Sequence, residues 1–460
     1  MARPTALQIF KYLKGVDPKK YGFESNMDLA IKLASREKKL SDFKDKLGLQ
    51  EKIYDELNEI LTPPVREINL KNYVIGGEEV LNRHELRFYN ETAFFVDISD
   101  NYSKEEILRR INFAKNLKVE RIGKFLKLQG IALRCESNDK DKFVEFLKFV
   151  KENGIDDLNL ILCSFNPEIL KAGVEILKSD YPLIYGATKE NFNDVFAIAL
   201  KNDLPLAICG NINDVGTMVR KAETKKFQKL VIDTGIITLK NFLTEAPNIR
   251  RAAINNIPEL RYPTMISTLP VWTENKIESL FKESALIAIA LDRFVSLIIF
   301  HSTELTFLLP NLYLRLNIYT DPRVSPTVEA KLYALNNPDE YSPVFVTTNF
   351  ALTYFAVTGD IGKPAWLVVV DTEGLAVLVS VAAAKFTGEK IAEKLKETKI
   401  AEKVKHRALI LPGLAAGIAG QTEEATGWKV FVGPKDSGEI NSFIEKTWIP
   451  YIEEFKKGKK

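Results

Sequence analysis

The sequence contains few of the residues that usually build metal sites and disulfide scaffolds. Its 460 residues include only three cysteines and three histidines: Cys135, Cys163, Cys209, His84, His301 and His406. So few thiols exclude a disulfide-framed fold and a metal or iron–sulfur site held by cysteines of this chain. The function is therefore expected to rest on other residues than a cysteine cluster.

The chain also lacks a charge imbalance and long apolar runs. Its 64 Lys and Arg residues against 61 Asp and Glu residues give a formal net charge of +3, and these charges are interspersed apart from a lysine-rich carboxyl end. This pattern argues against nucleic acid as the main partner. No uncharged stretch of about twenty apolar residues occurs, and the amino end lacks a signal-peptide core. We expect a cytoplasmic protein of two or three domains that is not inserted in a membrane.

From about residue 93, short apolar runs alternate with longer segments of helical periodicity, which is typical of repeated βα units. Expected helices include residues 104–117, 142–153, 167–178, 191–201, 215–225 and 273–294, with Asp, Asn or Thr near several starts, where helix caps lie. The eight expected strands are Ala93–Asp97, Ile131–Cys135, Leu158–Cys163, Pro182–Tyr185, Pro205–Cys209, Leu230–Asp233, Pro263–Ile266 and Val295–Phe300. This number of units predicts a (β/α)8 TIM barrel. An open doubly wound sheet is the alternative.

Polar and sulfur-bearing side chains of the expected barrel do not form a recognisable motif. The cysteines fall near carboxyl ends of strands, where barrel enzymes place catalytic groups, but we interpret them as small buried apolar residues. We interpret His301, after the last strand, as structural. An enzyme using Asp97 or Asp233 as a base is a further alternative. The barrel is therefore expected to be a scaffold.

A second α/β domain is expected from near residue 340. Three apolar strands, 366–370, 408–411 and 429–432, run into the turns Asp371–Gly374, Pro412–Gly413 and Gly433–Pro434. Because a ligand crevice lies outside the carboxyl ends of such strands, we expect these turns to meet at one site. The expected helices 375–384 and 414–420 are rich in Ala and Gly. Such helices suit either a large flat ligand or tight packing on the sheet.

Four segments of this domain carry a resemblance to a known family: residues 347–355, 371–374, 406–415 and 427–434. They resemble the corrinoid-binding domain of the large (gamma) subunit of the corrinoid iron–sulfur protein, the methyl carrier of the acetyl-CoA synthase/carbon monoxide dehydrogenase system. Further likeness lies at residues 63–67, 83–85, 161–164, 182–191 and 315–322, so that the resemblance spans about residues 5–448.

The resemblance implies three domains: a small helical iron–sulfur-type domain over 1–60, the TIM barrel over 61–320 and a Rossmann-like cobalamin-binding domain over 321–460. In the family, four cysteines spaced C-x2-C-G-x3-C-x16-C ligate the cluster. Aligned on Gly22 and the helix after it, those positions hold Pro18, Tyr21, Asn26 and Phe43. None supplies a thiolate, so we expect that this chain has no iron–sulfur cluster and no other bound metal of its own.

The resemblance also implies which residues contact the corrinoid. Backbone groups and hydroxyls of the turns would meet the amide side chains of the macrocycle, and Ala and Val would face its plane. Cobalt is expected to be base-off, without an axial histidine, because no D-x-H-x-x-G segment occurs and we interpret His406 as structural. The implied contacts are Thr348, Asn349, Thr353, Thr372, Glu373, Gly374, Val377, Pro412, Gly413, Ala416, Gly433 and Pro434.

The expected function is that of a corrinoid methyl carrier in one-carbon metabolism, a component of the Wood–Ljungdahl pathway. It would accept a methyl group on Co(I) from a methyl-pterin through a methyltransferase and pass it toward acetyl-CoA synthase. The implied partners are the small barrel subunit, as a heterodimer, that methyltransferase, acetyl-CoA synthase/carbon monoxide dehydrogenase and an external reductive activator of cobalt. The alternative is a non-catalytic assembly subunit that no longer binds cobalamin.

Overall fold

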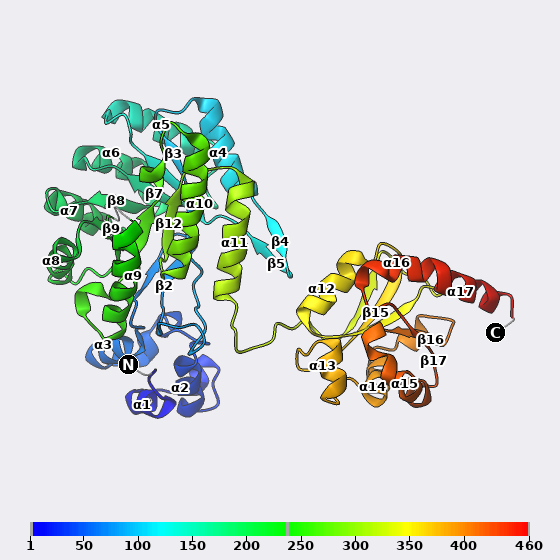
Figure 1. The fold of residues 1–460 in the computed structure, drawn as a ribbon. Coiled ribbons are helices and arrows are strands. Elements are labelled where there is room, and N and C mark those ends of the chain that lie inside the picture. Colours follow the sequence, from blue (N-terminus) through cyan, green and yellow to red (C-terminus); the bar gives the residue numbers. More distant parts are fainter. Residues whose placement is uncertain (1–2, 236–238, 459–460) are drawn as a thin grey trace. The chain divides into compact units, whose positions relative to one another are not determined.

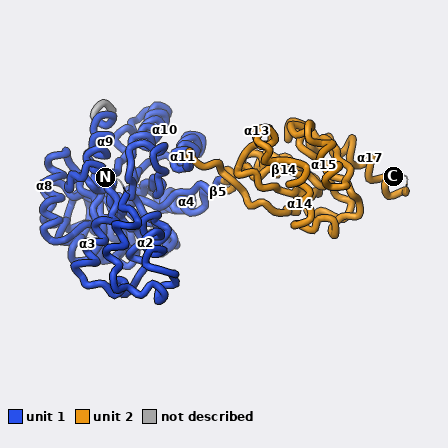
Figure 2. Tube along the Cα trace, turned by 90° about the horizontal axis from the view of Figure 1, so that it is seen from below, with its two compact units in different colours: residues 1–119, 125–321 blue, residues 120–124, 322–460 orange. Residues whose placement is uncertain are grey.

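The chain divides into two compact units. The computed structural model describes residues 3–235 and 239–458, without the side chains of residues 239–241. The first unit contains residues 1–119 and 125–321, and the second contains residues 120–124 and 322–460 (Figures 1 and 2). The hairpin of β4 (Val119–Arg121) and β5 (Lys124–Leu126) contributes to both. None of the helices in these described ranges has the length and apolar character needed to cross a membrane.

The first unit begins with a small helical segment that has a core of its own. Its α-helices are α1 (Ala6–Phe10), α2 (Asn26–Ala34) and α3 (Glu51–Leu61), joined by 3-10 turns, one of which covers Pro18–Tyr21. Ile9, Leu13, Leu29 and Leu57 are fully buried in this core. A hairpin of β1 (Glu67–Asn69) and β2 (Val74–Gly76) connects the segment to the barrel.

Eight parallel strands form the barrel, and a helix follows each of them. The strands are β3 (Ala93–Ser99), β6 (Gly130–Arg134), β7 (Asn159–Cys163), β8 (Leu183–Ala187), β9 (Leu206–Cys209), β10 (Leu230–Asp233), β11 (Met265–Ser267) and β12 (Leu297–Phe300). The helices are α4 (Lys104–Asn116), α5 (Lys140–Glu152), α6 (Pro167–Leu177), α7 (Phe192–Asn202), α8 (Ile212–Glu223), α9 (Leu239–Ile254), α10 (Lys276–Asp292) and α11 (Leu305–Tyr319).

The barrel closes between β10 and β11. The sheet order β10-β9-β8-β7-β6-β3-β12-β11 leaves these two strands at its ends, and a parallel bridge joins Ile232 to Thr264 across that gap. The predicted TIM barrel is confirmed, and the alternative open sheet is wrong for this unit. Strand residues are buried on both faces, as expected of parallel strands covered by helices, and Asp139, Asn166, Asn211 and Asn275 cap α5, α6, α8 and α10 as the sequence predicts.

The second unit is an open sheet with helices on both faces. Its order is β13-β15-β14-β16-β17, in which only β13 is antiparallel. The strands are β13 (Leu332–Leu335), β14 (Val344–Thr348), β15 (Ala365–Val370), β16 (Ala408–Leu411) and β17 (Lys429–Val432). The helices are α12 (Ala351–Asp360), α13 (Val377–Ala382), α14 (Gly388–Glu397), α15 (Ala419–Thr426), α16 (Ile440–Phe443) and α17 (Ile449–Lys456).

Two expectations for this unit need correction. The sheet begins before residue 340, because β13 already pairs with β15; this edge strand is short and only partly buried, so its apolar signal is weak. The expected helix over residues 414–420 starts as a 3-10 helix, Gly413–Ile418, and becomes α-helical only from Ala419. Separate apolar cores on the two faces of the sheet hold the unit together.

Candidate functional site

The carboxyl ends of the four parallel strands of the second unit meet at one edge of its sheet. The chain runs from the central strand β14 to β15 on one side and then crosses to β16 on the other. The order therefore reverses beside β14, and in open α/β sheets a ligand crevice forms at such a switch point. The turns after these strands are the ones that the sequence predicts to meet.

Asn349, directly after β14, organises the turn after β15. Its side-chain oxygen accepts hydrogen bonds from the Thr372 N–H, the Thr372 hydroxyl and the Gly374 N–H, each at 3.0 Å. Its amide nitrogen donates to Asp371 at 2.9 Å. Asn349 thus uses its polar atoms inside the protein, which holds two turns in a fixed geometry.

The turns after β16 and β17 touch backbone to backbone. The N–H of Gly413 donates to the carbonyl of Pro434 at 2.9 Å. A Cβ atom on Gly413 would lie 2.7 Å from the carbonyl oxygen of Gly433 and from the backbone nitrogen of Lys435. Only glycine allows this approach, so Gly413 is required by the geometry of the site.

A cavity of about 270 Å³ opens between these turns. Its walls are mostly apolar, with Phe345, Leu367 and Ile410 on the sheet side. Leu378 and Leu414, which also line the cavity, are exposed. A concave apolar site with a few polar groups is typical of cofactor sites.

Two hydroxyl groups at the end of β14 lack a hydrogen-bond partner among the described residues. Thr347 and Thr348 are buried, and neither Oγ1 atom is paired within that part of the chain. An unsatisfied buried polar group costs about 1–3 kcal/mol. Thr347 lines the cavity, so a ligand that hydrogen-bonds its hydroxyl would remove this cost.

The structure brings the twelve predicted corrinoid contacts to this edge in three groups. Five of them line the cavity: Thr353, Val377, Pro412, Gly433 and Pro434. Thr348, Asn349, Thr372, Gly374 and Gly413 are buried behind it, and Glu373 and Ala416 are exposed. The sequence interpretation missed Thr347, Ala356 and Leu378, which also line the cavity. The period-two alternation of β14, which puts Thr347 on the same face as Phe345, is the signal that identifies Thr347.

These features fit a large, flat, amphipathic group such as a corrinoid. The apolar walls suit a ring plane, the glycine-bearing turns let it approach the backbone, and the unpaired Thr347 hydroxyl offers it a hydrogen bond. His406 stands apart from the site, since it precedes β16 at the amino end of that strand. Its Nε2 donates to the Ser342 carbonyl at 3.0 Å and its Nδ1 accepts from the Ala408 N–H, and burial lowers its pKa.

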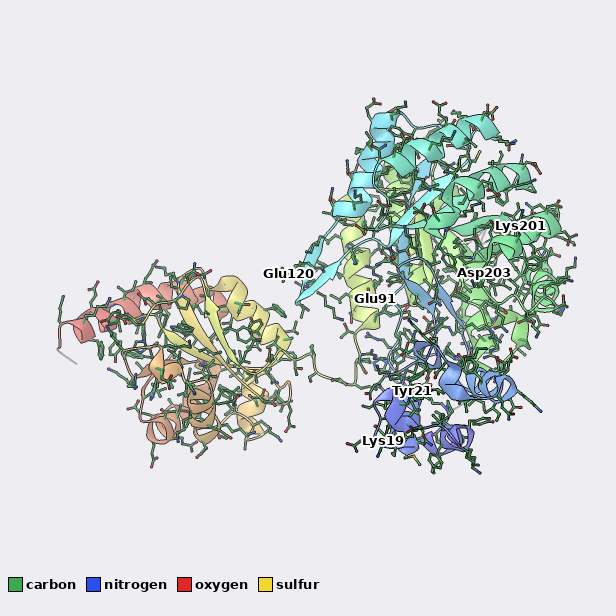
Figure 3. The ribbon with its side chains drawn as sticks, turned by 180° about the vertical axis from the view of Figure 1, so that it is seen from behind. Lys19, Tyr21, Glu91, Glu120, Lys201 and Asp203 are labelled. Carbon is green, nitrogen blue, oxygen red and sulfur yellow. The ribbon has the colours of Figure 1, made fainter. Side chains whose placement is uncertain are left out.

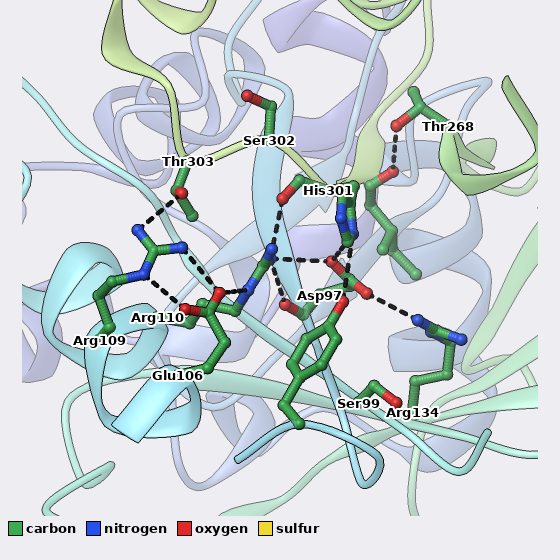
Figure 4. A network of polar contacts seen from close by, with 12 residues as sticks. Asp97, Ser99, Glu106, Arg109, Arg110, Arg134, Thr268, His301, Ser302 and Thr303 are labelled. Atoms are coloured by element: carbon green, nitrogen blue, oxygen red, sulfur yellow. Dashed lines mark hydrogen bonds and ion pairs between the residues drawn. The ribbon is translucent and has the colours of Figure 1, made fainter. Parts of the chain in front are cut away.

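A polar network occupies the carboxyl end of the barrel around Asp97 (Figure 4). Asp97 is fully buried and pairs with Arg110 at 3.1 Å and Arg134 at 3.1 Å. The Nδ1 atom of His301 lies 2.8 Å from the same carboxylate, and burial raises the pKa of the neighbouring Tyr102 to about 12. The carboxylate of Asp97 is thus engaged by internal partners.

The carboxylate of Asp233, at the end of β10, is likewise hydrogen-bonded to groups inside the protein. It is buried and accepts hydrogen bonds from the Tyr185 hydroxyl at 2.7 Å and from the Gly235 N–H at 2.8 Å. Burial raises the pKa of Asp233. Cys163 and Cys209 are buried nearby in the barrel, and burial raises the pKa of both thiols. These surroundings favour a structural role for Asp233, Cys163 and Cys209.

The chain matches over residues 68–444 a protein-family model described as the CO dehydrogenase/acetyl-CoA synthase delta subunit. Two curated relatives are named acetyl-CoA decarbonylase/synthase complex subunit gamma. The protein from Methanopyrus kandleri is 36% identical over 99% of this chain and 100% of its own length, and that from Archaeoglobus fulgidus is 36% identical over 96% and 98%.

The chain belongs to this acetyl-CoA decarbonylase/synthase subunit family. The family predicted from the sequence is thereby confirmed. Among solved structures, dihydropteroate synthase from Thermus thermophilus matches with a TM-score of 0.39 and 13% identity, over 55% of this chain and 100% of that chain.

In this member of the family, the four predicted cluster positions do not fit an iron–sulfur cluster. The rings of Tyr21 and Phe43 pack edge to face with centroids 5.4 Å apart, and the Asn26 amide donates to the carbonyls of Leu13 and Val16, each at 3.0 Å. Pro18 is the first residue of a 3-10 turn. Within the described ranges, no three His, Cys, Asp or Glu side chains gather as a metal site.

Proposed function

We propose that this chain is a cytoplasmic corrinoid-binding methyl carrier of an acetyl-CoA synthase complex. It accepts a methyl group from a methyl-pterin through a methyltransferase and delivers it toward acetyl-CoA synthase. The observation that carries this proposal is the mostly apolar cavity at the switch point of the second unit, which is lined in part by Thr347, whose buried hydroxyl has no partner among the described residues. A bound corrinoid supplies the cobalt on which a methyl group is carried.

Each part of the site has a distinct role in this proposal. Thr347 hydrogen-bonds the polar periphery of the cofactor, and the backbone of the turns at Gly413 and Gly433 approaches it closely. Asn349 holds the turn after β15 in place through its bonds to Thr372 and Gly374. Glu373 and Ala416 contact it from the rim, as the sequence predicts. Because His406 is buried at the opposite end of β16, it leaves the cobalt without a histidine ligand from this unit.

The proposal also includes two further partners, a small barrel subunit and an external reductant. A small barrel subunit forms a heterodimer with the chain and covers the exposed apolar rim. Since Pro18, Tyr21, Asn26 and Phe43 cannot ligate a cluster, the chain has no electron relay of its own. An external reductant therefore restores oxidised cobalt.

The test is anaerobic reconstitution of the full chain with hydroxocobalamin. We expect one cobalt per chain and a base-off corrinoid absorption spectrum, with no iron or acid-labile sulfide. Thr347→Val, which keeps the side-chain shape but removes the hydroxyl, should weaken cobalamin binding by about tenfold, in the range of one buried hydrogen bond. Thr217→Val, an exposed position on α8, is the control and should bind as the wild type.

A non-catalytic assembly subunit is the second candidate. The satisfied polar atoms of Asn349 and Thr372 favour it, because these turns keep their geometry without a ligand. Reconstitution separates the two functions. A chain that takes up no cobalt, alone and together with its small subunit, is the assembly subunit, and the methyl-carrier proposal then fails.

A further inference from the structure

A second cavity, of about 250 Å³, lies within the first unit between the helical segment and the barrel. Residues 33–41, after and within the end of α2, form one wall, and residues 58–63, at the end of α3, form another. Residues 66–69 and Gln228 close it from the barrel side. Gln228 precedes β10, so the cavity is at the amino end of the barrel, opposite to the Asp97 network.

The lining of this cavity is strongly basic. Arg36, Lys38, Lys39 and Arg66 contribute four positive charges, and Glu67 is the single carboxylate among the described residues of the lining. Glu67 is already neutralised, because it forms ion pairs with Arg36 and, at 2.6 Å, with Lys39. Lys38 forms no ion pair with the described residues, and the only described carboxylate paired with Arg66 is that of Glu59, at 3.4 Å.

The guanidinium group of Arg66 makes only long polar contacts, and one of its nitrogen atoms has no partner among the described residues. The side chain is only 13% exposed, yet its contacts to Gln228, at 3.2 Å, and to Glu59, at 3.4 Å, are long. Glu59 is bound more closely by Arg261, at 2.6 Å. The Nε atom of Arg66 is buried and has no acceptor among the described residues. A buried guanidinium donor without a partner is costly and calls for an acceptor.

Other donors of the lining are free as well. The Lys38 ammonium, the Ser41 hydroxyl and the Asn58 amide make no hydrogen bond with any described residue. Together with Arg66 they offer donors from several directions around one small volume. A tetrahedral oxyanion with three or four acceptor oxygens matches this arrangement better than a planar carboxylate does.

We propose that this cavity is a binding site for a small phosphate-class anion, such as inorganic phosphate, a phosphate monoester or a diphosphate. Arg66 and Lys38 are its cationic contacts, and Ser41 and Asn58 supply further hydrogen bonds. The bound anion bridges the helical segment and the barrel, since its contacts come from both. The site is independent of the corrinoid proposal because it lies in the other unit.

The test uses pyrophosphate and inorganic phosphate as probes on the full chain, by isothermal titration calorimetry at constant ionic strength. We expect saturable binding at one site. Arg66→Gln should lower the affinity about tenfold, as expected for the loss of a charged hydrogen-bonding group, and Lys38→Gln should lower it severalfold. Lys201→Gln, on α7 outside the barrel (Figure 3), makes the same charge change away from the cavity and should leave the affinity unchanged.

Three results would overturn the proposal. One is the absence of saturable pyrophosphate binding at millimolar concentration. Another is equal weakening by Lys201→Gln and Lys38→Gln, which would indicate diffuse attraction to net charge. The third is tighter binding of citrate than of pyrophosphate, which would replace the phosphate class by carboxylates. If Arg66→Gln does not fold, Lys38→Gln decides, because this exposed side chain has no hydrogen bond or ion pair with the described residues to lose.

Discussion

At the residue scale, His406 makes stability depend on pH. Burial lowers its pKa, so the folded chain keeps the ring neutral while the unfolded chain takes up a proton near its ordinary pKa of about 6.5. Above that pH, neither state is protonated and stability is complete. As the pH falls below it, the unfolded state gains protons first, and the free energy of unfolding decreases.

The prediction is that the second unit loses stability in the wild type as the pH falls below about 6.5, the ordinary pKa of histidine, and that His406→Gln removes most of this dependence. The measurement is hydrogen–deuterium exchange of β16, which reports on this unit alone. His84→Gln, exposed in the first unit, should behave as the wild type. If the pH dependence of stability is unchanged in His406→Gln, other titratable groups cause it.

Some residues of the candidate site can be predicted from the sequence, and others cannot. Turn residues such as Gly413 and Gly433 can be predicted because a glycine at the end of an apolar strand is typical of a tight turn with close backbone approach. The alternation of β14 can distinguish the face of Thr347 from that of Thr348, but it does not predict that the Thr347 hydroxyl is unpaired. Only the three-dimensional structure shows that Thr347 lines the cavity and that its hydroxyl has no partner among the described residues.

At the element scale, the turn after β15 depends on one side chain. Asn349→Ala would leave the buried N–H groups of Thr372 and Gly374 without their acceptor. We expect a loss of about 2–4 kcal/mol in the free energy of unfolding, from several buried hydrogen bonds. Urea unfolding measures it.

Lys385→Ala is the control for that variant, because it removes an ion pair with Glu373 on the same turn. Glu373 is exposed, and an exposed pair contributes about 0–1 kcal/mol. Equal losses in the two variants would show that Asn349 does not organise the turn.

The barrel elements were predictable because each strand is a short apolar run, and because α4, α5, α6, α8 and α10 begin after a side chain that caps the helix. Predicted and observed strands begin within a few residues of each other, as at Leu230–Asp233, where the bounds coincide. β13 and the 3-10 helix Gly413–Ile418 were not predictable. A short, partly exposed edge strand carries little periodicity, and the segment Gly413–Ile418 is too short for its helical periodicity to distinguish a 3-10 helix from an α-helix.

At the scale of the whole molecule, separate cores imply separate unfolding. The first unit has the barrel core and the core of the helical segment, and the second unit has a core on each face of its sheet. Because no described core cluster spans the two units, we expect differential scanning calorimetry of the full chain to show more than one transition.

Ligands should then shift these transitions selectively. Cobalamin at about 100 times its Kd adds about 2.7 kcal/mol to the free energy of unfolding of the unit that binds it, so only the transition of the second unit should rise. Pyrophosphate should raise only that of the first. We expect chelators of iron to change neither, since the rings of Tyr21 and Phe43 pack against each other at positions where the sequence resemblance predicts cluster ligands. A single transition that moves as a whole with either ligand would contradict this independence, and destabilisation of the first unit by the chelator would show that it holds a metal.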